Sequence, residues 1–385
     1  MNQLLRKSLL EYHRIRGFVL YESFPLVTDD PTVLFTNATV TPFKHFFGNQ
    51  DVTPHNYALI QRCLRVGGGA GGLETAQQNP NYSSLFEMFG CGLFNCAYPV
   101  AVKYFIDMLD HIGLPKAKLR FTVPEGSDFT DALIKNGIEN SSIFAINENG
   151  EFWQEWRFGK NGLVGKGLTA IFARENHHTR SVDEMINQPQ SFVEIGNLIH
   201  IHGKAEAERI IPVAHDGFDV GIGIGRLAIA LTGGTLYELS PFRELVEIVA
   251  KSLKMLGVDD LSTGTSRVVT DHLRSIVALT QEGVIPGNKQ QAFVLRKLIR
   301  SLLEIVWLSV GKVVSLAEIT SAFAEFDSPG QSLPVVKVVI EEERIFRETL
   351  ERGRVILAKN PLLTSEILRD TYGIRQSLLP LISGL

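Results

Sequence analysis

The spacing of apolar positions along the 385-residue chain changes near residue 245. Before that point, short alternating runs of strand length are mixed with a few segments of helical spacing. Strands and helices do not alternate regularly, so this part predicts an α+β architecture, a mostly antiparallel sheet flanked by helices. The strands expected there are 33–35, 118–123, 142–146, 168–173, 192–202 and the start of 219–231, and the helices are 3–16, 99–112 and 130–136.

Nearly all of the chain after residue 245 has helical periodicity. Apolar residues recur there every three or four positions, in the segments 266–279, 289–308, 316–326, 338–358 and 364–372. The change of period predicts two domains, a sheet-containing domain over 1–245 and an all-helical domain over 246–385.

One stretch, residues 61–94, organises the first domain. Arg65 lies in an apolar run, a glycine-rich loop follows, and a second apolar run, 85–89, closes the stretch. Two such runs joined by a loop are typical of an antiparallel pair of strands. A buried arginine at its base needs an anion, and a phosphate fits the guanidinium fork. Because Phe86 in the returning strand is suited to stack on a flat base, the stretch predicts a nucleotide site.

Composition and charge limit the class of protein. The chain is 44% hydrophobic and 21% charged, as in globular proteins, and no apolar run reaches the roughly 18 residues of a membrane span. Its N-terminal segment carries charges throughout, which is unlike a signal peptide. Cys63, Cys91 and Cys96 have no metal-binding spacing and fit a reducing cytoplasm. The net charge of −4 means that any nucleic-acid surface must be local.

Three further patterns are weak signals. The glycines of 221–225 have the wrong spacing for a dinucleotide fingerprint, and 165–167 lacks the Ser or Thr that follows the lysine of a phosphate-binding loop. His200 and His202 lie two residues apart on one strand, and without a third ligand they make a poor metal site. We therefore expect no protein-built metal centre.

Several segments together resemble a known family. Residues 61–94 resemble motif 2 of the class II aminoacyl-tRNA synthetases, in particular of the alanyl-tRNA synthetases, whose version begins QRC-x-R-x-GG and ends FFEM-x-G. The other matches, in family order, are 30–38 (DPTVLFTNA) to motif 1, 218–226 (FDVGIGIGR) to motif 3, 271–275 (DHLRS) and 293–300 (FVLRKLIR) to the tRNA-recognition region, and 341–353 to the helix beyond it.

The resemblance implies an enzyme that uses ATP and Mg²⁺ to activate a small amino acid, alanine first, and transfers it to tRNA. It implies catalytic roles for Arg65 and Arg226. The ATP contacts implied are Arg65, Glu74, Phe86, Met88, Gly223 and Arg226. The amino-acid contacts implied are Trp153, Asn197, Ile199, Asp219 and Gly221.

Each of the main residues also has a structural explanation. Arg65 would then pair with Glu74 or Glu87, and Arg226 would be a surface arginine of a helix. Phe86 would be a core residue. Asp219 would cap a helix that begins soon after it, although the glycines that follow leave room for a small substrate.

The tRNA contacts implied by the resemblance are Asn288, Lys289, Arg296 and Arg300. Asn288 also has the sequence of a helix N-cap, with Gln291 completing a capping box. Arg296 and Arg300 are four residues apart and so share a helix face. With Lys289 and Lys297 they predict a basic patch free of acidic residues, which as an alternative is a solvated helix surface.

The chain also departs from the family pattern. It has 69–72 (GAGG) where the family has Lys-His-Asn-Asp, Gly225 in place of a glutamate, and 39–41 (TVT) in place of Gly-Met-Asn. It ends where the family's editing domain begins, which suggests a paralogue of the first two domains. Transfer to a non-tRNA acceptor and non-catalytic tRNA binding therefore stay open as alternatives, and a monomer is compatible with the missing C-terminal association region.

Overall fold

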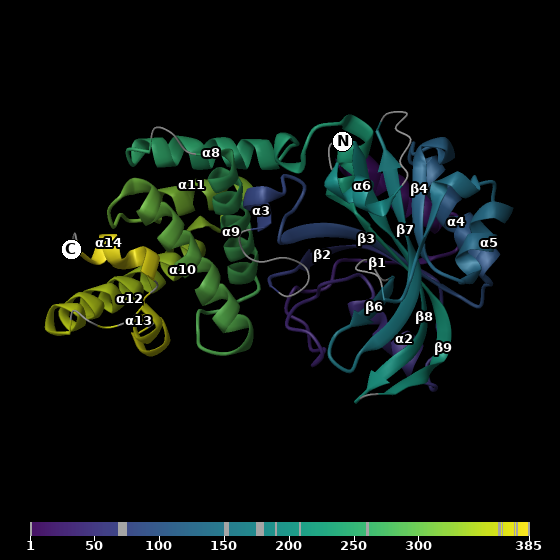
Figure 1. Cartoon of the computed structure of the whole chain (residues 1–385), viewed down its shortest axis with the longest axis horizontal. Helices are drawn as coiled ribbons and strands as arrows, with labels where there is room; N and C mark the ends of the chain where they lie inside the picture. Colours follow the sequence, from purple (N-terminus) through teal and green to yellow (C-terminus); the bar gives the residue numbers. More distant parts are fainter. Residues whose placement is uncertain are drawn as a thin grey trace. The chain divides into compact units, whose positions relative to one another are not determined.

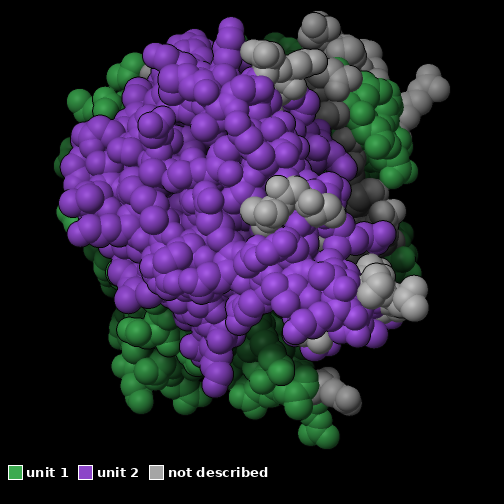
Figure 2. Space-filling view, turned by 90° about the vertical axis from the view of Figure 1, so that its left-hand side faces the viewer, with its two compact units in different colours: residues 1–64, 86–236 green, residues 65–85, 237–385 purple. Residues whose placement is uncertain are grey.

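A computed structural model describes residues 2–67, 75–149, 154–174, 181–188, 191–207, 209–258, 262–360, 363, 365–372, 374 and 376–383. The chain forms two compact units, which Figure 2 colours separately. Unit 1 comprises Met1–Leu64 and Phe86–Leu236, and unit 2 comprises Arg65–Leu85 and Tyr237–Leu385. The division therefore differs from a single boundary near residue 245, because the loop segment 65–85 folds with the helices that follow residue 236.

Unit 1 is built on a sheet in which, within the described residues, nine strands have the order β1-β2-β3-β9-β8-β7-β4-β5, with β6 beside β7 (Figure 1). Pairs β1/β2 and β4/β5 are parallel, and β3/β9, β9/β8, β8/β7, β7/β4 and β6/β7 are antiparallel. The mostly antiparallel sheet is thus confirmed. The strands are β1 Val19–Tyr21, β2 Tyr57–Leu64, β3 Leu85–Phe94, β4 Leu119–Pro124, β5 Ile143–Ile146, β6 Glu155–Phe158, β7 Leu163–Ala173, β8 Phe192–Glu206 and β9 Arg209–Gly223.

Helices of unit 1 flank this sheet, as their amphipathic spacing predicts. α1 buries Leu5, Leu9 and Tyr12, and α4 buries Phe105 and Leu109. The α-helices are α1 Asn2–Arg14, α2 Lys44–Gly48, α4 Tyr98–His111, α5 Asp128–Lys135, α6 Val182–Asn187 and α7 Ile224–Thr232, with 3₁₀ turns at Thr41–Phe43, Lys116–Lys118 and Asn140–Ser142.

The strand expected at 33–35 is wrong. Only an isolated bridge joins Val27 to Phe35, and Leu34 is 44% exposed. The Thr36 amide donates to the Leu26 carbonyl oxygen at 2.8 Å, and the Thr36 carbonyl oxygen accepts from the Leu64 amide at 3.0 Å. Three apolar residues in a row do not make a strand when no neighbouring strand continues the pairing.

Unit 2 is helical, as the sequence periodicity predicts. Ser262 caps the N-terminus of α9 by accepting a hydrogen bond from the Thr265 amide. Trp307 stacks on Phe346 in the core, with ring centroids 5.6 Å apart. No helix in the described part of the chain is both long and apolar enough to cross a membrane. The helices are α3 Thr75–Gln78, α8 Phe242–Met255, α9 Thr263–Gln281, α10 Gln290–Val310, α11 Ala317–Asp327, α12 Ser332–Lys359, α13 Ser365–Tyr372 and α14 Leu379–Ser383, with a 3₁₀ turn at Gln376–Leu378.

Candidate functional site

The strand register brings seven of the predicted contact residues onto one face of the sheet of unit 1. Residues paired directly across antiparallel strands project to the same side, as do residues two apart on one strand. The register pairs Met88 with Gly223, Asn197 with Gly221, and Ile199 with Asp219. We call this surface the ligand face, and it comprises Phe86 and Met88 of β3, Asn197 and Ile199 of β8, and Asp219, Gly221 and Gly223 of β9.

Asp219 is the charged group of the ligand face. Its side chain is buried, with 2% exposure, and among the described residues no cation forms an ion pair with it. Burial raises the pKa of the Asp219 carboxyl well above its usual range, and a long hydrogen bond from the Tyr57 hydroxyl, 3.5 Å, partly opposes the rise. A carboxylate desolvated in this way gains from a bound cation.

The helix-cap explanation of Asp219 is excluded. β9 continues through Gly223, and Gly223 itself occupies the N-cap position of α7. Asp219 therefore lies four residues before the cap, in the middle of a buried strand pair. The expectation that 219–231 passes from strand into helix is confirmed, with the change between Gly223 and Ile224.

Two further side chains lie beside the ligand face: Tyr57, which the sequence analysis missed, and Thr39, which it named only as part of a departure from motif 1. The Tyr57 ring stacks on Phe43, with centroids 3.7 Å apart, and occupies the space beside Gly92, where an added Cβ would lie 2.2 Å from the ring. Thr39 covers Gly90 in the same manner, at 2.0 Å. The glycines at 90 and 92, two apart on β3, were the available sequence signal, because strand glycines mark close approach of other groups.

Asn197 is held by a short chain of side-chain hydrogen bonds. Its Nδ2 donates to the Thr169 hydroxyl at 2.7 Å, and that hydroxyl donates to Gln154 Oε1 at 2.8 Å. The chain fixes the orientation of the Asn197 amide. Opposite, Gly221 has no side chain, and an added Cβ would lie 3.3 Å from the Met88 sulfur. Polar and small groups are thus held together around Asp219.

The two predicted catalytic arginines belong to different units, and their convergence on ATP stays a prediction. Arg226, near the start of α7, pairs with Glu194 at 2.8 Å, and both side chains are about half exposed. Arg65 belongs to unit 2 and directly follows β2. Glu87, one of its suggested partners, forms an ion pair with Arg6 of α1. Glu74 and Trp153 lie outside the described residues.

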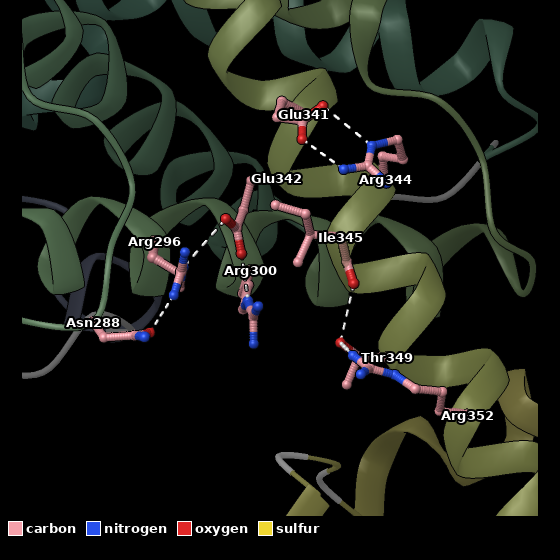
Figure 3. A network of polar contacts seen from close by, with 9 residues as sticks. All are labelled: Asn288, Arg296, Arg300, Glu341, Glu342, Arg344, Ile345, Thr349 and Arg352. Carbon is pink, nitrogen blue, oxygen red and sulfur yellow. Dashed lines mark hydrogen bonds and ion pairs between the residues drawn. The ribbon is translucent and has the colours of Figure 1, made fainter.

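Three of the four predicted tRNA contacts of unit 2, Asn288, Arg296 and Arg300, form a network around an acidic side chain (Figure 3). Glu342, 1% exposed, accepts hydrogen bonds from Arg296 Nε at 3.2 Å and from Arg300 Nε at 2.7 Å. The expected acid-free patch is therefore wrong, because α12 supplies a carboxylate from 42 residues further along the chain. A buried carboxylate held by two guanidiniums fixes the direction of both.

The capping explanation of Asn288 is also wrong. α10 begins at Gln290, its N-cap position is Lys289, and no side chain caps it. The Asn288 side-chain oxygen instead accepts a hydrogen bond from Arg296. A cavity of about 220 Å³ lies beside this network in unit 2. Its lining includes the cations Arg296, Lys297 and Arg300 and the aromatic residues Phe293 and Phe346.

His200 and His202 are explained without a metal. His200 Nδ1 lies 2.8 Å from the Tyr98 hydroxyl and its Nε2 lies 3.2 Å from Asp216. Burial lowers the pKa of His200, and the Asp216 carboxylate opposes that shift. Across the described ranges no cluster of three or more histidine, cysteine, aspartate or glutamate side chains is placed to hold a metal ion.

The sequence matches a known family over nearly its whole length. Residues 4–375 match the family described as "tRNA synthetases class II (A)", and the chain belongs to this family. Among curated proteins it is 30% identical to the alanine–tRNA ligases of Nitrosomonas europaea and Acidithiobacillus ferridurans, in each case over 96% of this chain and 45% of the relative. The chain thus spans a little under half the length of these relatives.

A solved structure also matches, at greater distance. The apo histidyl-tRNA synthetase of S. aureus aligns with 60% of this chain and 65% of its own, at 11% identity and a TM-score of 0.35. A likeness of this size carries no conclusion about the site. Family membership rests on the sequence match over most of the chain.

Proposed function

We propose that the protein activates a small amino acid, with alanine first among the candidates, by reaction with ATP and transfers the aminoacyl group to tRNA. The observation that carries the proposal is the desolvated Asp219 carboxylate on the ligand face, where the described residues provide no cation. An α-ammonium group supplies the missing charge, and Gly221 and Gly223, which follow Asp219 on the same face of β9, carry no side chains. The names of the curated relatives support the same choice.

In the proposed reaction a carboxylate oxygen of the amino acid attacks the α-phosphorus of ATP, and pyrophosphate leaves. Asp219 holds the ammonium group, and Asn197 offers a fixed amide to the substrate. Arg65 and Arg226 stabilise charge on the phosphates, which is the main requirement of phosphoryl transfer chemistry. Phe86, half-buried on the ligand face, is the proposed stacking partner of adenine.

Mg²⁺ is proposed as a companion of ATP rather than as a resident ion. It usually keeps several waters and binds through substrate phosphates with one or two carboxylates. When bound, it neutralises phosphate charge.

Transfer to tRNA is proposed from unit 2. Arg296 and Arg300 are fixed by Glu342, and Asn288 contacts Arg296. Two oriented guanidiniums beside a cavity with aromatic walls suit sugar-phosphate and base contacts. Lys289 and Lys297 are exposed and add charge on the same surface.

The test is amino-acid-dependent exchange of labelled pyrophosphate into ATP, run with each of the twenty standard amino acids, followed by charging of whole tRNA. We expect exchange with one small amino acid and charging of one tRNA. Absence of both would refute the proposal. Exchange without charging would instead favour a non-tRNA acceptor, and tRNA binding without exchange would favour a non-catalytic binder.

A further inference from the structure

The side chain of Asp271 of α9 lies inside unit 2 and not on its surface, although its sequence segment resembles the family's tRNA-recognition region. Its side chain is fully buried. Its Oδ1 accepts hydrogen bonds from the Ser84 amide at 2.7 Å and from the Ser83 hydroxyl at 2.9 Å. Both serines belong to segment 65–85 of unit 2, which includes Arg65. A buried carboxylate that accepts two hydrogen bonds is a strong anchor for a loop.

Two arginines of the same helix hold the segment at further points. Arg274 donates to the Leu85 carbonyl oxygen at 2.8 Å and to the Ser83 hydroxyl at 3.2 Å, and its guanidinium lies 4.2 Å from the centroid of the Phe242 ring. Arg267 donates to the carbonyl oxygens of Ala76 and Gln77 at 2.9 and 2.7 Å. α9 thus contacts the segment near both α3 and the start of β3.

The anchored serines in turn fix the backbone of Arg65. The Arg65 amide donates to the Ser84 carbonyl oxygen at 2.9 Å, and the Arg65 carbonyl oxygen accepts from the Tyr82 hydroxyl at 3.2 Å. Asp271 is therefore two hydrogen-bonded steps from the Arg65 backbone. A shift of residues 83–84, which directly precede β3, therefore moves the Arg65 backbone and the base of its side chain.

We propose that Asp271 and Arg274 are positioning residues for Arg65, so that the helical unit serves amino-acid activation and not only tRNA recognition. This inference rests on the proposed function, because it assigns Arg65 to ATP. A misplacement of about 1 Å of a catalytic group costs on the order of 10²-fold in rate. Loosening the Asp271 anchor is therefore expected to lower the rate of adenylate formation without removing any group that touches substrate.

The test compares Asp271→Ala with Glu343→Ala in the full chain. Glu343 is a matched control, since it is also a buried carboxylate of unit 2 that accepts a backbone amide, from Leu316 at 3.0 Å, but it contacts no residue of 65–85 in the described structure. At a temperature where both variants are folded, we expect Asp271→Ala to lower kcat of pyrophosphate exchange by about 10²-fold, with a smaller change in the KM for the amino acid. Glu343→Ala should keep wild-type exchange.

A double-mutant comparison with Arg65 distinguishes a positioning role of Asp271 from a general loss of stability. In an Arg65→Lys background, Asp271→Ala should cost much less than it does in the wild type, because residues that act as a unit are not additive. Equal costs in both backgrounds, or wild-type kcat in Asp271→Ala, would overturn the inference. Arg274→Lys should restore part of the rate lost in Arg274→Ala, since the cation is kept.

Amide hydrogen exchange tests the inference without any measurement of enzyme activity. The amides of Arg65 and Ser84 should exchange faster in Asp271→Ala than in the wild type and in Glu343→Ala, as their hydrogen bonds open more often. Unchanged protection would overturn the inference. If the wild type shows no pyrophosphate exchange with any amino acid, the proposed function fails, and amide protection alone then decides whether Asp271 anchors the segment.

Discussion

Asp219 in the sheet unit and Glu342 in the helical unit are both buried carboxylates, with 2% and 1% exposure, but their partners differ. Glu342 is held by two arginines from the neighbouring helix. Asp219 has only the long contact from Tyr57, and no ion pair within the described residues. The charge of Glu342 is neutralised within the fold. The charge of Asp219 is not, and we propose that a ligand neutralises it.

A buried carboxylate therefore has a different effect in each of the two units. A paired carboxylate orients the groups that hold it, and its removal disturbs structure first. An unpaired one destabilises the free protein and gains when a cation binds. Substitution of Asp219 should therefore lower activity first, and substitution of Glu342 should lower stability first. Four predictions test that contrast, beginning with the largest effect.

Asp219→Asn should abolish most amino-acid activation. The loss of one partner of a buried charge pair costs about 2–5 kcal/mol, which is about 30-fold to about 4 × 10³-fold in kcat/KM for the amino acid. Pyrophosphate exchange measured over a range of amino-acid concentrations checks this. Asp216→Asn, on the same strand but 76% exposed, is the control and should keep wild-type values. Wild-type kcat/KM in Asp219→Asn would refute the role.

Glu342→Gln should act on stability instead. Two arginines lose a charged acceptor, which we expect to lower the free energy of unfolding by about 1–3 kcal/mol. Urea denaturation followed by circular dichroism measures it. Glu348→Gln, whose exposed side chain pairs with Arg344 on the same helix, should stay close to the wild type. An unfolding free energy equal to the wild type in Glu342→Gln would show that the network contributes no stability.

The pH dependence of stability should differ between wild type and Asp219→Asn. Burial raises the native pKa of Asp219, so above the ordinary aspartate range the folded state binds more protons than the unfolded state. The free energy of unfolding contributed by this group then falls as pH rises. Asp219→Asn removes that loss, so its Tm relative to wild type should increase from pH 5 to pH 8.

The difference between the two proteins is the quantity to measure, because other buried groups titrate as well. Burial lowers the pKa of His13 from its usual 6.5 to about 4. The stability that neutral His13 contributes is therefore lost as pH falls from about 6.5 towards 4, so its effect on the free energy of unfolding changes with pH in the opposite direction to that of Asp219. His13 is present in both proteins and cancels. A Tm difference that stays constant or shrinks from pH 5 to pH 8 would contradict the raised pKa.

Tyr57→Phe should have the smallest effect. It removes one hydroxyl at 3.5 Å from Asp219 and keeps the ring against Phe43. Because that hydrogen bond is long, we expect the KM for the amino acid to change by about 2- to 5-fold. Tyr21→Phe, whose hydroxyl contacts His55 instead, is the control. Loss of activity as large as in Asp219→Asn would mean that Tyr57 has a direct chemical role.

Much of the fold was predictable because its elements carry strong local signals. The helical spacing of α1, α4 and α9 to α12 and the alternation of β7 and β8 correspond to segments expected from the sequence. The segment 33–35 failed because a strand needs a partner that local pattern does not name.

The candidate site was predicted residue by residue, but its organisation was not. Phe86, Asn197 and Asp219 came from motif resemblance, and their sharing of one face depends on register. Tyr57 carried no motif and was missed. The acid-free patch around Arg296 was wrong because Glu342 lies 42 residues from Arg300.

The sequence by itself determined the family, the order of strands and helices, and the residue types available for chemistry, because these depend on local pattern and motif spacing. Tertiary structure alone decided which charges are paired. In the sequence, Asp219 lies among glycine and apolar residues and Glu342 lies between two other glutamates, and neither setting names a partner. Only the approach of a distant helix pairs Glu342 with Arg296 and Arg300, whereas Asp219 has no ion pair within the described residues. Pairing depends on distances in space, and sequence separation does not encode them.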